Sequence, residues 1–258
     1  MSAAARFTVV IPARMRSTRL PGKMLADIGG KPLVAWVVER ARASGAVRVV
    51  VATDHDEIAR ALARLGCEVC LTSPEHETGT DRIAEAVTQL GLDDNDIVVN
   101  VQGDEPLIDP RLVSRVAELL SNHREASVAT AAVPIAIAAD FFDPNVVKVV
   151  VDREGFAEYF SRAPIPYARD AFAQTRAVLP PGLPACRHIG IYAYRVRFLR
   201  QYASLEAVSA ERFEALEQLR ALAHGYRIAV APWNEPMPPG VDTPEDLERV
   251  RRQLIIQG

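Results

Sequence analysis

The sequence predicts an α/β protein with a three-layer, doubly wound mixed sheet and a small antiparallel, proline-rich lobe. Short apolar runs rich in β-branched residues recur in the first half of the chain, as expected of parallel strands that are buried on both faces. Segments with helical spacing of apolar residues alternate with these runs. This alternation ends near residue 146, where two strand-like runs and a proline-rich stretch follow. We therefore expect a single domain over residues 1–258, with an inserted lobe at roughly residues 145–190 for substrate contacts or dimerisation.

The first half of the chain predicts a repeated order of strand and helix. Phe7 to Ile11 is short, bounded and apolar, so it is expected to form a buried parallel strand. The other strands of this half are expected at residues 47–53, 68–71 and 97–101. One helix is expected at residues 32–43. Three others are expected to begin at Asp54, near Asp81 and at Asp109-Pro110. Asp54 is expected to cap its helix, because Glu57 follows three residues later as in a capping box.

The second half of the chain departs from this order. Residues 146–151 and 156–160, joined by a turn at 152–155, predict an antiparallel hairpin. Residues 162–184 are rich in proline and predict an excursion from the sheet. The remaining elements are expected to be strands at 128–134, 188–194 and 228–231, helices at 197–202 and 211–222, and a last helix capped by Thr243 with Pro244 at its first position.

Composition and charge exclude several classes of function. The chain has 258 residues, of which 49% are hydrophobic and 24% charged, as in ordinary globular domains. The net charge of -3 gives no overall field that favours nucleic acid or an anionic membrane. Three cysteines are too few for a disulfide framework, and Cys67 and Cys70 point to opposite faces of an expected strand. Neither a signal peptide nor a membrane-spanning run is recognisable, so the expected compartment is the cytoplasm.

A loop dense in cations follows the first strand. Arg14, Arg16, Arg19 and Lys23 fall within ten positions, and Pro21-Gly22 predicts a sharp turn. Because the carboxyl ends of parallel strands are where open α/β sheets bind ligands, this loop suits a polyphosphate. An ordinary solvated basic turn is the alternative. Neither the P-loop spacing nor the dinucleotide fingerprint is present, so any anion is bound by another kind of loop.

Carboxylates follow the fourth expected strand. Asp104 and Glu105 come directly after residues 97–101 and are expected beside the basic loop if the sheet is doubly wound. Mg²⁺ in nucleotide sites takes one or two carboxylates and leaves places for phosphate oxygens and water, a role that suits Asp104. A simple turn is the alternative. Asp242 precedes the last helix cap, so capping does not explain it, and Arg82 lies in a first helical turn, where backbone N–H groups favour anions.

Several segments together resemble one known family. They are FTVVIPARMRSTRLPGKML, VATDHDEIA, TGTDRIAEAV, VVNVQGDEPLI, NVVKVVVDREGFAEYFSRAPIPY, RHIGIYAYR, LEQLRAL and GVDTPEDLERV, and they cover nearly the whole chain. In this order they closely resemble the 3-deoxy-manno-octulosonate cytidylyltransferases, or CMP-Kdo synthetases. The first and fourth segments alone indicate only a nucleotidyltransferase of the glycosyltransferase-A-like fold. The last three segments narrow the resemblance to the Kdo branch.

The resemblance implies a reaction and its requirements. CTP and Kdo would give CMP-Kdo and pyrophosphate by in-line attack of the anomeric hydroxyl on the α-phosphorus, for lipopolysaccharide synthesis. Mg²⁺ would be the cofactor, and the protein would be a cytoplasmic homodimer with no nucleic acid or membrane partner. Since phosphoryl transfer depends mainly on positioning and charge neutralisation, the chain is expected to supply cations and metal ligands rather than a nucleophile.

The resemblance also implies site residues. The expected catalytic residues are Lys23, Arg14 and Asp104. The expected nucleotide-binding residues are Pro12, Ala13, Arg14, Arg19, Lys23 and Arg82. The expected metal ligands are Asp104 and Asp242. The expected Kdo-binding residues are Gln102, Arg162, Arg169, His188, Tyr192, Glu217 and Gln218.

Some of these residues have other interpretations without the resemblance. Arg162 and Arg169 suit a carboxylate substrate on physical grounds alone. His188 and Tyr192 lie four apart on one face of an expected strand, which suits packing as well as a shared ligand. Glu217-Gln218 equally fits an exposed helical face. Two alternative functions stay open: a cytidylyltransferase for a related acid sugar, such as an amino analogue of Kdo or a sialic acid, and a nucleotide-binding protein without turnover.

Overall fold

The computed structural model describes residues 5–15, 17, 19–76 and 78–256. They form two compact units, which we describe separately. Unit 1 comprises Met1–Glu118, Ala193–Ala203 and Pro236–Gly258, and unit 2 comprises Leu119–Tyr192 and Ser204–Glu235. Compactness does not establish that either unit folds alone, so the single domain with an inserted lobe stays a prediction.

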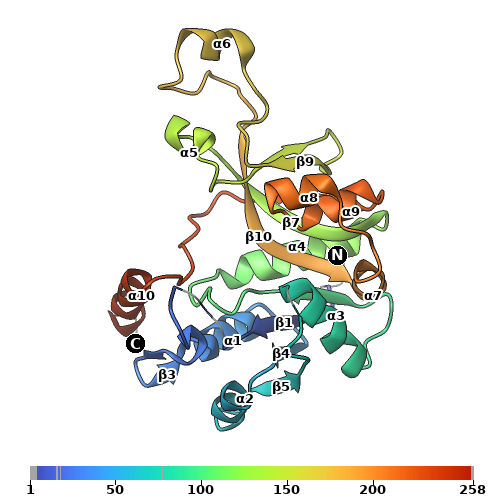
Figure 1. Cartoon of the computed structure of the whole chain (residues 1–258), viewed down its shortest axis with the longest axis vertical. Coiled ribbons are helices and arrows are strands. Elements are labelled where there is room, and N and C mark those ends of the chain that lie inside the picture. The colour runs from blue at the N-terminus through green and yellow to red at the C-terminus, as the bar shows by residue number, and fades with distance from the viewer. Residues whose placement is uncertain (1–4, 16, 18, 77, 257–258) are drawn as a thin grey trace. The chain divides into compact units, whose positions relative to one another are not determined.

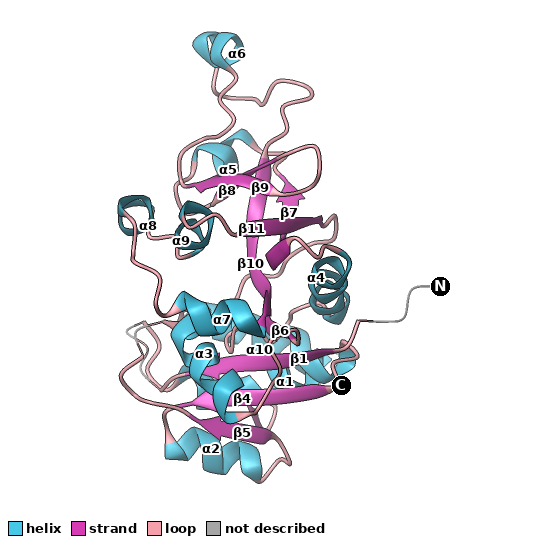
Figure 2. Ribbon diagram, turned by 90° about the vertical axis from the view of Figure 1, so that its right-hand side faces the viewer, coloured by secondary structure: helices cyan, strands magenta, loops and turns pink. Residues whose placement is uncertain are grey.

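Unit 1 contains a parallel sheet with β1 in its interior. The strands β6 (Ile97–Asn100), β1 (Phe7–Ala13), β4 (Arg48–Thr53) and β5 (Glu68–Leu71) lie side by side in this order (Figure 2). Every residue of β1 is buried, as the continuous apolar run predicts for a strand covered on both faces. Because β6 and β1 are parallel neighbours, the loops that follow them start at the same edge of the sheet.

Helices and short elements complete unit 1. The helices are α1 (Leu33–Ala43), α2 (Asp56–Ala63), α3 (Gly79–Gln89), α7 (Val196–Tyr202), α10 (Pro244–Ile256) and the first part of α4 (Pro110–Asn122). A 3₁₀ turn η1 (Lys23–Leu25) and the short strands β2 (Asp27–Ile28) and β3 (Lys31–Pro32) follow the basic loop. In the described part of the chain, no helix is long and apolar enough to cross a membrane.

Unit 2 combines parallel and antiparallel pairs. The strands β7 (Ala126–Pro134) and β11 (Arg227–Pro232) are parallel, whereas β8 (Lys148–Val151) pairs antiparallel with β9 (Ala157–Ser161) and with β10 (Cys186–Arg195). The predicted hairpin is therefore confirmed. The helices of unit 2 are α5 (Ala138–Phe142), α6 (Arg169–Gln174), α8 (Ser209–Glu214) and α9 (Gln218–Ala223) (Figure 1).

The proline-rich excursion contains an anchor that the sequence analysis missed. α6 lies within it, and Phe172 of α6 is buried against Phe141 of α5 and Ala185. The rings of Phe141 and Phe172 are 5.7 Å apart between centroids. A five-residue and a six-residue helix are too short for an apolar period to be visible in the sequence, so a few aromatic contacts hold this segment.

The predicted α/β class with a parallel-dominated sheet is confirmed, and the predicted strands end within two residues of the observed ones. Two details were wrong. His55, and not Asp54, caps α2, because the His55 side chain accepts from the Glu57 backbone N–H. The helix expected at residues 211–222 is broken into α8 and α9 at Ala215, whose φ of 50° is left-handed.

Candidate active site

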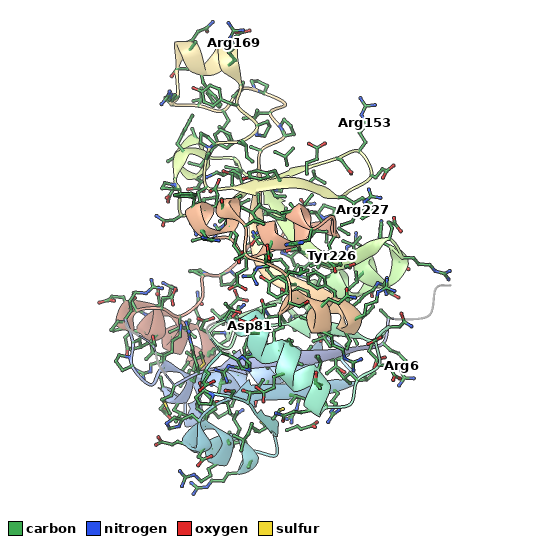
Figure 3. The ribbon with its side chains drawn as sticks, turned by 45° about the vertical axis from the view of Figure 1, so that its right-hand side comes forward. Arg6, Asp81, Arg153, Arg169, Tyr226 and Arg227 are labelled. Carbon is green, nitrogen blue, oxygen red and sulfur yellow. The ribbon has the colours of Figure 1, made fainter. Side chains whose placement is uncertain are left out.

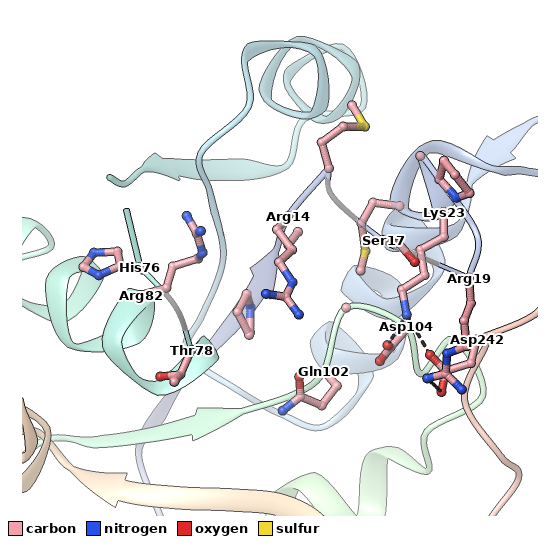
Figure 4. A pocket seen from close by; sticks show the side chains of 18 residues that line it. Arg14, Ser17, Arg19, Lys23, His76, Thr78, Arg82, Gln102, Asp104 and Asp242 are labelled. Carbon is pink, nitrogen blue, oxygen red and sulfur yellow. Dashed lines mark hydrogen bonds and ion pairs between the residues drawn. The ribbon is translucent and has the colours of Figure 1, made fainter. Parts of the chain in front are cut away.

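A pocket of about 780 Å³ lies in unit 1, where the loops after β1 and β6 begin. Its lining combines the basic loop, the start of α3, the loop after β6 and the approach to α10 (Figure 4). The lining residues are Pro12, Ala13, Arg14, Met15, Ser17, Arg19, Pro21, Gly22, Lys23, Met24, His76, Thr78, Gly79, Arg82, Gln102, Gly103, Asp104 and Asp242. All the predicted nucleotide-binding and metal-binding residues, together with Gln102, therefore line one cavity. Arg16 lies outside the described residues.

The basic loop turns sharply into the pocket. Gly22 has a φ of 69°, a left-handed conformation that glycine adopts at little cost, and it begins the 3₁₀ turn η1. The turn buries the side chain of Lys23, which is only 10% exposed. Arg14 and Arg19 are exposed, and Arg14 has no hydrogen bond or ion pair with any described residue. Among the described cations of the loop, Arg14 is therefore the one without a protein partner, and it lies between the two ends of the pocket (Figure 4).

Lys23 joins the two predicted metal ligands. Its Nζ donates to Asp104 Oδ2 at 2.6 Å and to Asp242 Oδ1 at 3.1 Å. A third bond, of 3.1 Å, goes to the backbone oxygen of Val241. Arg19 Nη2 lies 3.0 Å from Asp242 Oδ2. Two carboxylates thus converge on one ammonium group, and two cations balance their charge.

The backbone after β6 is fixed closely against β1. A Cβ added to Gly103 would lie 2.9 Å from the Pro12 backbone oxygen and 3.1 Å from Met24 Sδ, so this close approach requires glycine. The backbone N–H of Val241 donates to the Asp104 backbone oxygen at 2.8 Å. The loop that carries Asp104 is therefore held from both sides, by β1 and by the segment that precedes α10.

Asp242 is positioned by a capping arrangement that the sequence analysis found only in part. Thr243 accepts from the backbone N–H of Asp246, as the predicted cap requires, and the Asp246 carboxylate accepts in return from the backbone N–H of Thr243 at 3.0 Å. Asp246 also accepts from the Asp242 N–H at 3.1 Å. A hydrogen bond from Arg249 and these backbone N–H groups lower the pKa of Asp246 to about 2. The Thr-x-x-Asp spacing was the signal that could have identified Asp246.

The carboxyl group next to Asp104 has a different environment. Burial, together with the neighbouring negative charge of Asp104, raises the pKa of Glu105 to about 8. Lys23 and the ion pairs described above keep Asp104 and Asp242 in a compensated, partly exposed setting, with side chains 29% and 45% exposed. Two adjacent carboxyl groups of the same turn are therefore in contrasting settings.

The far wall of the pocket is held by contacts of Arg82 and of His76. Arg82 donates to Thr72 Oγ1 at 2.6 Å and to Asp54 Oδ2 at 2.8 Å. Its side chain is only 3% exposed. Its guanidinium therefore fixes the wall before any contact with a ligand. His76 Nε2 lies 2.5 Å from Glu85 Oε2, and this pair holds the loop that leads into α3. His76 also lines the pocket.

The donor set at one end of the pocket fits a magnesium ion. The carboxylate oxygens of Asp104 and Asp242 converge on the ammonium group of Lys23. Mg²⁺ in nucleotide sites commonly takes one or two carboxylates plus phosphate oxygens. Among the described residues there is no group of three or more acidic, histidine or cysteine side chains that would hold a metal without a nucleotide. These residues thus suit an ion that arrives with phosphate ligands.

Six of the seven predicted Kdo-binding residues lie in unit 2. Arg162 donates from Nε to the Glu214 backbone oxygen at 2.6 Å and from Nη1 to the Pro144 backbone oxygen at 2.9 Å. Glu214 in turn accepts from the Arg162 backbone N–H and from Ser161 Oγ. Arg162 is therefore anchored to the end of α8, next to Ala215 and shortly before Glu217-Gln218.

His188 and Tyr192 share one face of β10, as the strand spacing predicts, and their ring centroids are 5.3 Å apart. His188 Nε2 lies 2.9 Å from Thr130 Oγ1, and the ring packs edge-on against Phe160. Burial lowers the pKa of His188 to about 3, so its imidazole is neutral at physiological pH. The His188 side of this pair is thus packed against Thr130 and Phe160 of unit 2.

The other three residues of this set have different settings. Arg169 is 95% exposed at the outer end of the α6 segment, where it lies 3.9 Å from Asp170 (Figure 3). Glu217 is exposed at the start of α9. Gln218 begins α9, and its Nε2 is buried without a hydrogen-bond partner among the described residues. That orphaned donor is the one feature of α9 that suits a polar ligand.

The fold and the site together define a nucleotidyltransferase of the cytidylyltransferase class, and a family model described as cytidylyltransferase matches residues 8–228. A 3-deoxy-manno-octulosonate cytidylyltransferase from Pseudomonas fluorescens (strain Pf-5) is 58% identical over 248 residues, which cover 96% of this chain and 98% of that protein. The chain therefore belongs to the 3-deoxy-manno-octulosonate cytidylyltransferase family.

Solved structures agree with this assignment. The structure of CMP:2-keto-3-deoxy-manno-octonic acid synthetase complexed with CTP has a TM-score of 0.89 and 40% identity, and the match covers 98% of this chain and 100% of that one. A cytidylyltransferase from Leptospira borgpetersenii serovar Hardjo-bovis has a TM-score of 0.61 at 19% identity, covering 98% of this chain and 87% of that one. The second likeness shows the shared fold alone.

Proposed function

We propose that this protein activates Kdo as its cytidine monophosphate: CTP and Kdo give CMP-Kdo and pyrophosphate. The observation that carries the proposal is the convergence of Asp104 and Asp242 on Lys23 at the edge of a pocket lined by Arg14 and Arg19. This arrangement provides cations for a triphosphate beside carboxylates for a metal ion. The choice of CTP and Kdo is supported by the relative at 58% identity and by the CTP complex at 40% identity.

The nucleotide would bind along the pocket in unit 1. Arg14, Arg19 and Lys23 would contact the triphosphate, since charge-assisted bonds from cations to phosphate oxygens are among the stronger hydrogen bonds in proteins. Pro12 and Ala13 would contact the cytidine through their backbone. We propose that Arg82 also contributes to cytidine binding. It would do so mainly by holding the pocket wall in place through its bonds to Thr72 and Asp54.

Asp104 and Asp242 would hold Mg²⁺. When bound, the ion would neutralise charge on the α-phosphate and on the leaving pyrophosphate. Val241 and Asp246 would keep these two ligands in place, through the bonds from Val241 N–H to Asp104 and from Asp242 N–H to Asp246. The rigid attachment of both loops matters because catalysis of phosphoryl transfer depends on positioning.

Kdo would be bound by Gln102, Arg162, Arg169, His188, Tyr192, Glu217 and Gln218. Arg162 is suited to the sugar carboxylate, because its Nε and Nη1 are anchored on backbone oxygens while Nη2 has no described partner. The neutral imidazole of His188 and the buried amide of Gln218 would offer hydrogen bonds to sugar hydroxyl groups.

In the reaction, the anomeric hydroxyl oxygen of Kdo bonds to the α-phosphorus of CTP while the bond between the α-phosphorus and the bridging oxygen breaks. Pyrophosphate leaves in line, and Arg14, Arg19 and Lys23 would bind the charge that accumulates on it. We assign no residue as the base that takes the hydroxyl proton.

The test is a pyrophosphate-release assay with each of the four nucleoside triphosphates, with Kdo and with related acid sugars. We expect release with CTP and Kdo in the presence of Mg²⁺. CTP binding without release would instead support a nucleotide-binding protein without turnover. A higher kcat/KM with an amino analogue of Kdo or a sialic acid would reassign the sugar.

Two further proposals accompany this function. We propose that the protein works as a homodimer, as the family resemblance implies, and that it works in the cytoplasm, as expected from the sequence analysis. Light scattering of the purified protein and fractionation of cells that express it would test the two proposals separately.

A further inference from the structure

Lys23 has an unusual position for a residue that is expected to bind phosphate. All three donors of its ammonium group are used within the protein, by Asp104, Asp242 and the Val241 backbone oxygen, at 2.6 to 3.1 Å. The side chain is 10% exposed, whereas the two carboxylates are 29% and 45% exposed. The ammonium thus lies between the carboxylates, and the carboxylates remain reachable from the pocket.

We propose that Lys23 makes divalent-cation binding dependent on the nucleotide, because its ammonium group occupies the place between Asp104 and Asp242 until a triphosphate draws it away. This inference rests on the proposed function, since it takes these two carboxylates as the metal ligands. It adds a role for Lys23 beyond phosphate contact: the lysine and the divalent cation are alternative counter-ions for the same pair of carboxylates.

The charges around the pair explain the dependence. Asp104 and Asp242 carry two negative charges, which Lys23 and Arg19 balance, and Arg14 adds a further positive charge to the pocket. A divalent cation without nucleotide would therefore approach three positive groups, and it would have to displace an ammonium whose remaining partner would be the Val241 backbone oxygen. Charges a few ångströms apart in a partly buried site interact strongly, because the effective dielectric there is well below that of water. Divalent binding alone is thus weak.

The nucleotide alone meets the opposite difficulty. Phosphate oxygens can attract Lys23, whose four-carbon stem is flexible, but its departure would leave two carboxylates facing a polyanion. When both ligands are present, the ammonium bonds to phosphate and the divalent cation compensates the carboxylates. Each ligand thereby removes the penalty that the other encounters, so the two bind with positive coupling, which is reciprocal by thermodynamic necessity.

The decisive measurement uses Mn²⁺ as the probe, because Mn²⁺ favours the same carboxylate oxygen ligands as Mg²⁺ and is visible by electron paramagnetic resonance. Mn²⁺ is titrated into the full chain without nucleotide or sugar. In Lys23→Met, the carboxylates lose their ammonium, and we expect Mn²⁺ to bind about 5- to 150-fold more tightly than in the wild type. Lys23→Gln is the second variant if Lys23→Met does not give a normal thermal unfolding transition.

Two variants serve as matched controls. Lys23→Arg keeps the positive charge and is expected to leave Mn²⁺ binding weak. Lys31→Met changes the net charge of the protein by the same amount, but Lys31 pairs with Glu39 outside the pocket lining, at 2.5 Å. It is expected to bind Mn²⁺ like the wild type. A gain in both methionine variants would indicate a general charge effect and would overturn the inference.

The coupling itself is the second readout. CTP affinity is measured by calorimetry with and without Mn²⁺, in the absence of sugar so that no turnover occurs. We take the ratio of the CTP affinity with Mn²⁺ to the CTP affinity without Mn²⁺. In Lys23→Met this ratio should be lower than in the wild type, by the same factor by which nucleotide-free Mn²⁺ binding is tighter. Loss of a phosphate contact weakens both CTP affinities equally and therefore leaves the ratio unchanged. An unchanged ratio would overturn the inference.

Asp104→Asn separates this inference from the proposed metal site. If Asp104→Asn abolishes CTP-dependent Mn²⁺ binding while Lys23→Met leaves nucleotide-free Mn²⁺ binding unchanged, the metal site stands and the role of Lys23 is wrong. If Asp104→Asn changes Mn²⁺ binding neither with CTP nor without it, the proposed metal site is wrong, and the inference is wrong as well. If Lys23→Met gains Mn²⁺ binding and the double variant with Asp104→Asn loses it again, both are supported.

Discussion

The pocket of unit 1 and the proposed sugar-binding residues of unit 2 differ in how the protein holds them. Around Lys23, each charged group is bonded to others from distant parts of the chain, so that Asp104 and Asp242 meet at one point. In unit 2, Arg162, His188 and Arg169 have separate environments: one anchored to backbone, one packed in the core and one exposed.

The two sets of residues also differ in what brings their members together. Asp104 and the basic loop follow neighbouring parallel strands, so the topology of the sheet brings them together in any sequence of this fold. The proposed sugar-binding residues share no such topological reason, and their assignment rests mainly on the family resemblance.

Asp104→Asn is expected to reduce kcat/KM by about 10²- to 10³-fold, as for the loss of one group that stabilises transition-state charge. The protein should stay folded, because asparagine keeps the shape of the side chain and Lys23 retains Asp242 and Val241 as partners. Steady-state kinetics and a thermal melt provide the two measurements. Near-normal turnover would remove the metal role from Asp104.

Gly103→Ala is expected to destabilise the protein by about 1 to 3 kcal/mol, because the new methyl group would lie 2.9 Å from a backbone oxygen of β1. Urea unfolding measures this effect. The matched control is Gly190→Ala in β10 of unit 2, where an added Cβ has no described atom within 4 Å. Equal effects of the two substitutions would contradict the close approach of the Asp104 loop to β1.

His188→Gln is expected to change the pH dependence of stability. The pKa of His188 is about 3 in the folded protein and near 6.5 when unfolded, so the unfolded state binds the extra proton between these values. Stability therefore falls as the pH drops below about 6.5, by up to about 1.4 kcal/mol per pH unit from this group. The variant should show a shallower fall between pH 6.5 and pH 5 in urea titrations. An unchanged slope would show that the ring is not buried in its neutral form.

Asp246→Ala is expected to cost about 1 kcal/mol, since it removes half of the reciprocal cap at the start of α10. Because Asp246 also holds the backbone of Asp242, the Mg²⁺ concentration for half-maximal activity should rise. Glu245→Ala is the matched control, since this neighbouring acid is exposed. If both substitutions shift the Mg²⁺ requirement equally, Asp246 has no positioning role.

Arg169→Ala is expected to change the free energy of unfolding by less than about 0.5 kcal/mol, because the side chain is 95% exposed. Thermal unfolding measures this. With stability unchanged, the KM for Kdo reports on sugar contact alone. An unchanged KM for Kdo would remove Arg169 from the proposed sugar-binding set.

Much of unit 1 was predictable because its elements follow strong periodic patterns. The apolar run from Phe7 predicted a buried strand, and the observed β1 extends this run to Ala13 with every residue buried. The meeting of Asp104 with Lys23 followed from strand adjacency, which a doubly wound order fixes. Their chemical roles stay predictions, since geometry alone does not show a reaction.

The errors arose where local signals competed or were too short. Asp54 and His55 were both able to cap α2; Asp54 instead accepts from the buried Arg82, a contact between distant residues that no local pattern shows. The break at Ala215 could not be predicted, because alanine strongly favours helix and only tertiary bonds at Glu214 accompany the left-handed turn. Asp246 was missed because the cap was interpreted from Thr243 and Pro244 alone.

The bond between Lys23 and the Val241-Asp242 segment has a consequence for biosynthesis. Val241 and Asp242 follow Lys23 by 218 and 219 residues in the sequence. The ribosome therefore makes Lys23 long before these two partners. A nascent chain can thus form β1 and pair Lys23 with Asp104 long before Asp242 exists. A premature stop codon shortly before Val241 would leave the sheet encoded but remove two of the three partners of Lys23. We expect such a product to keep the basic loop, to lack the second carboxylate and therefore to be inactive.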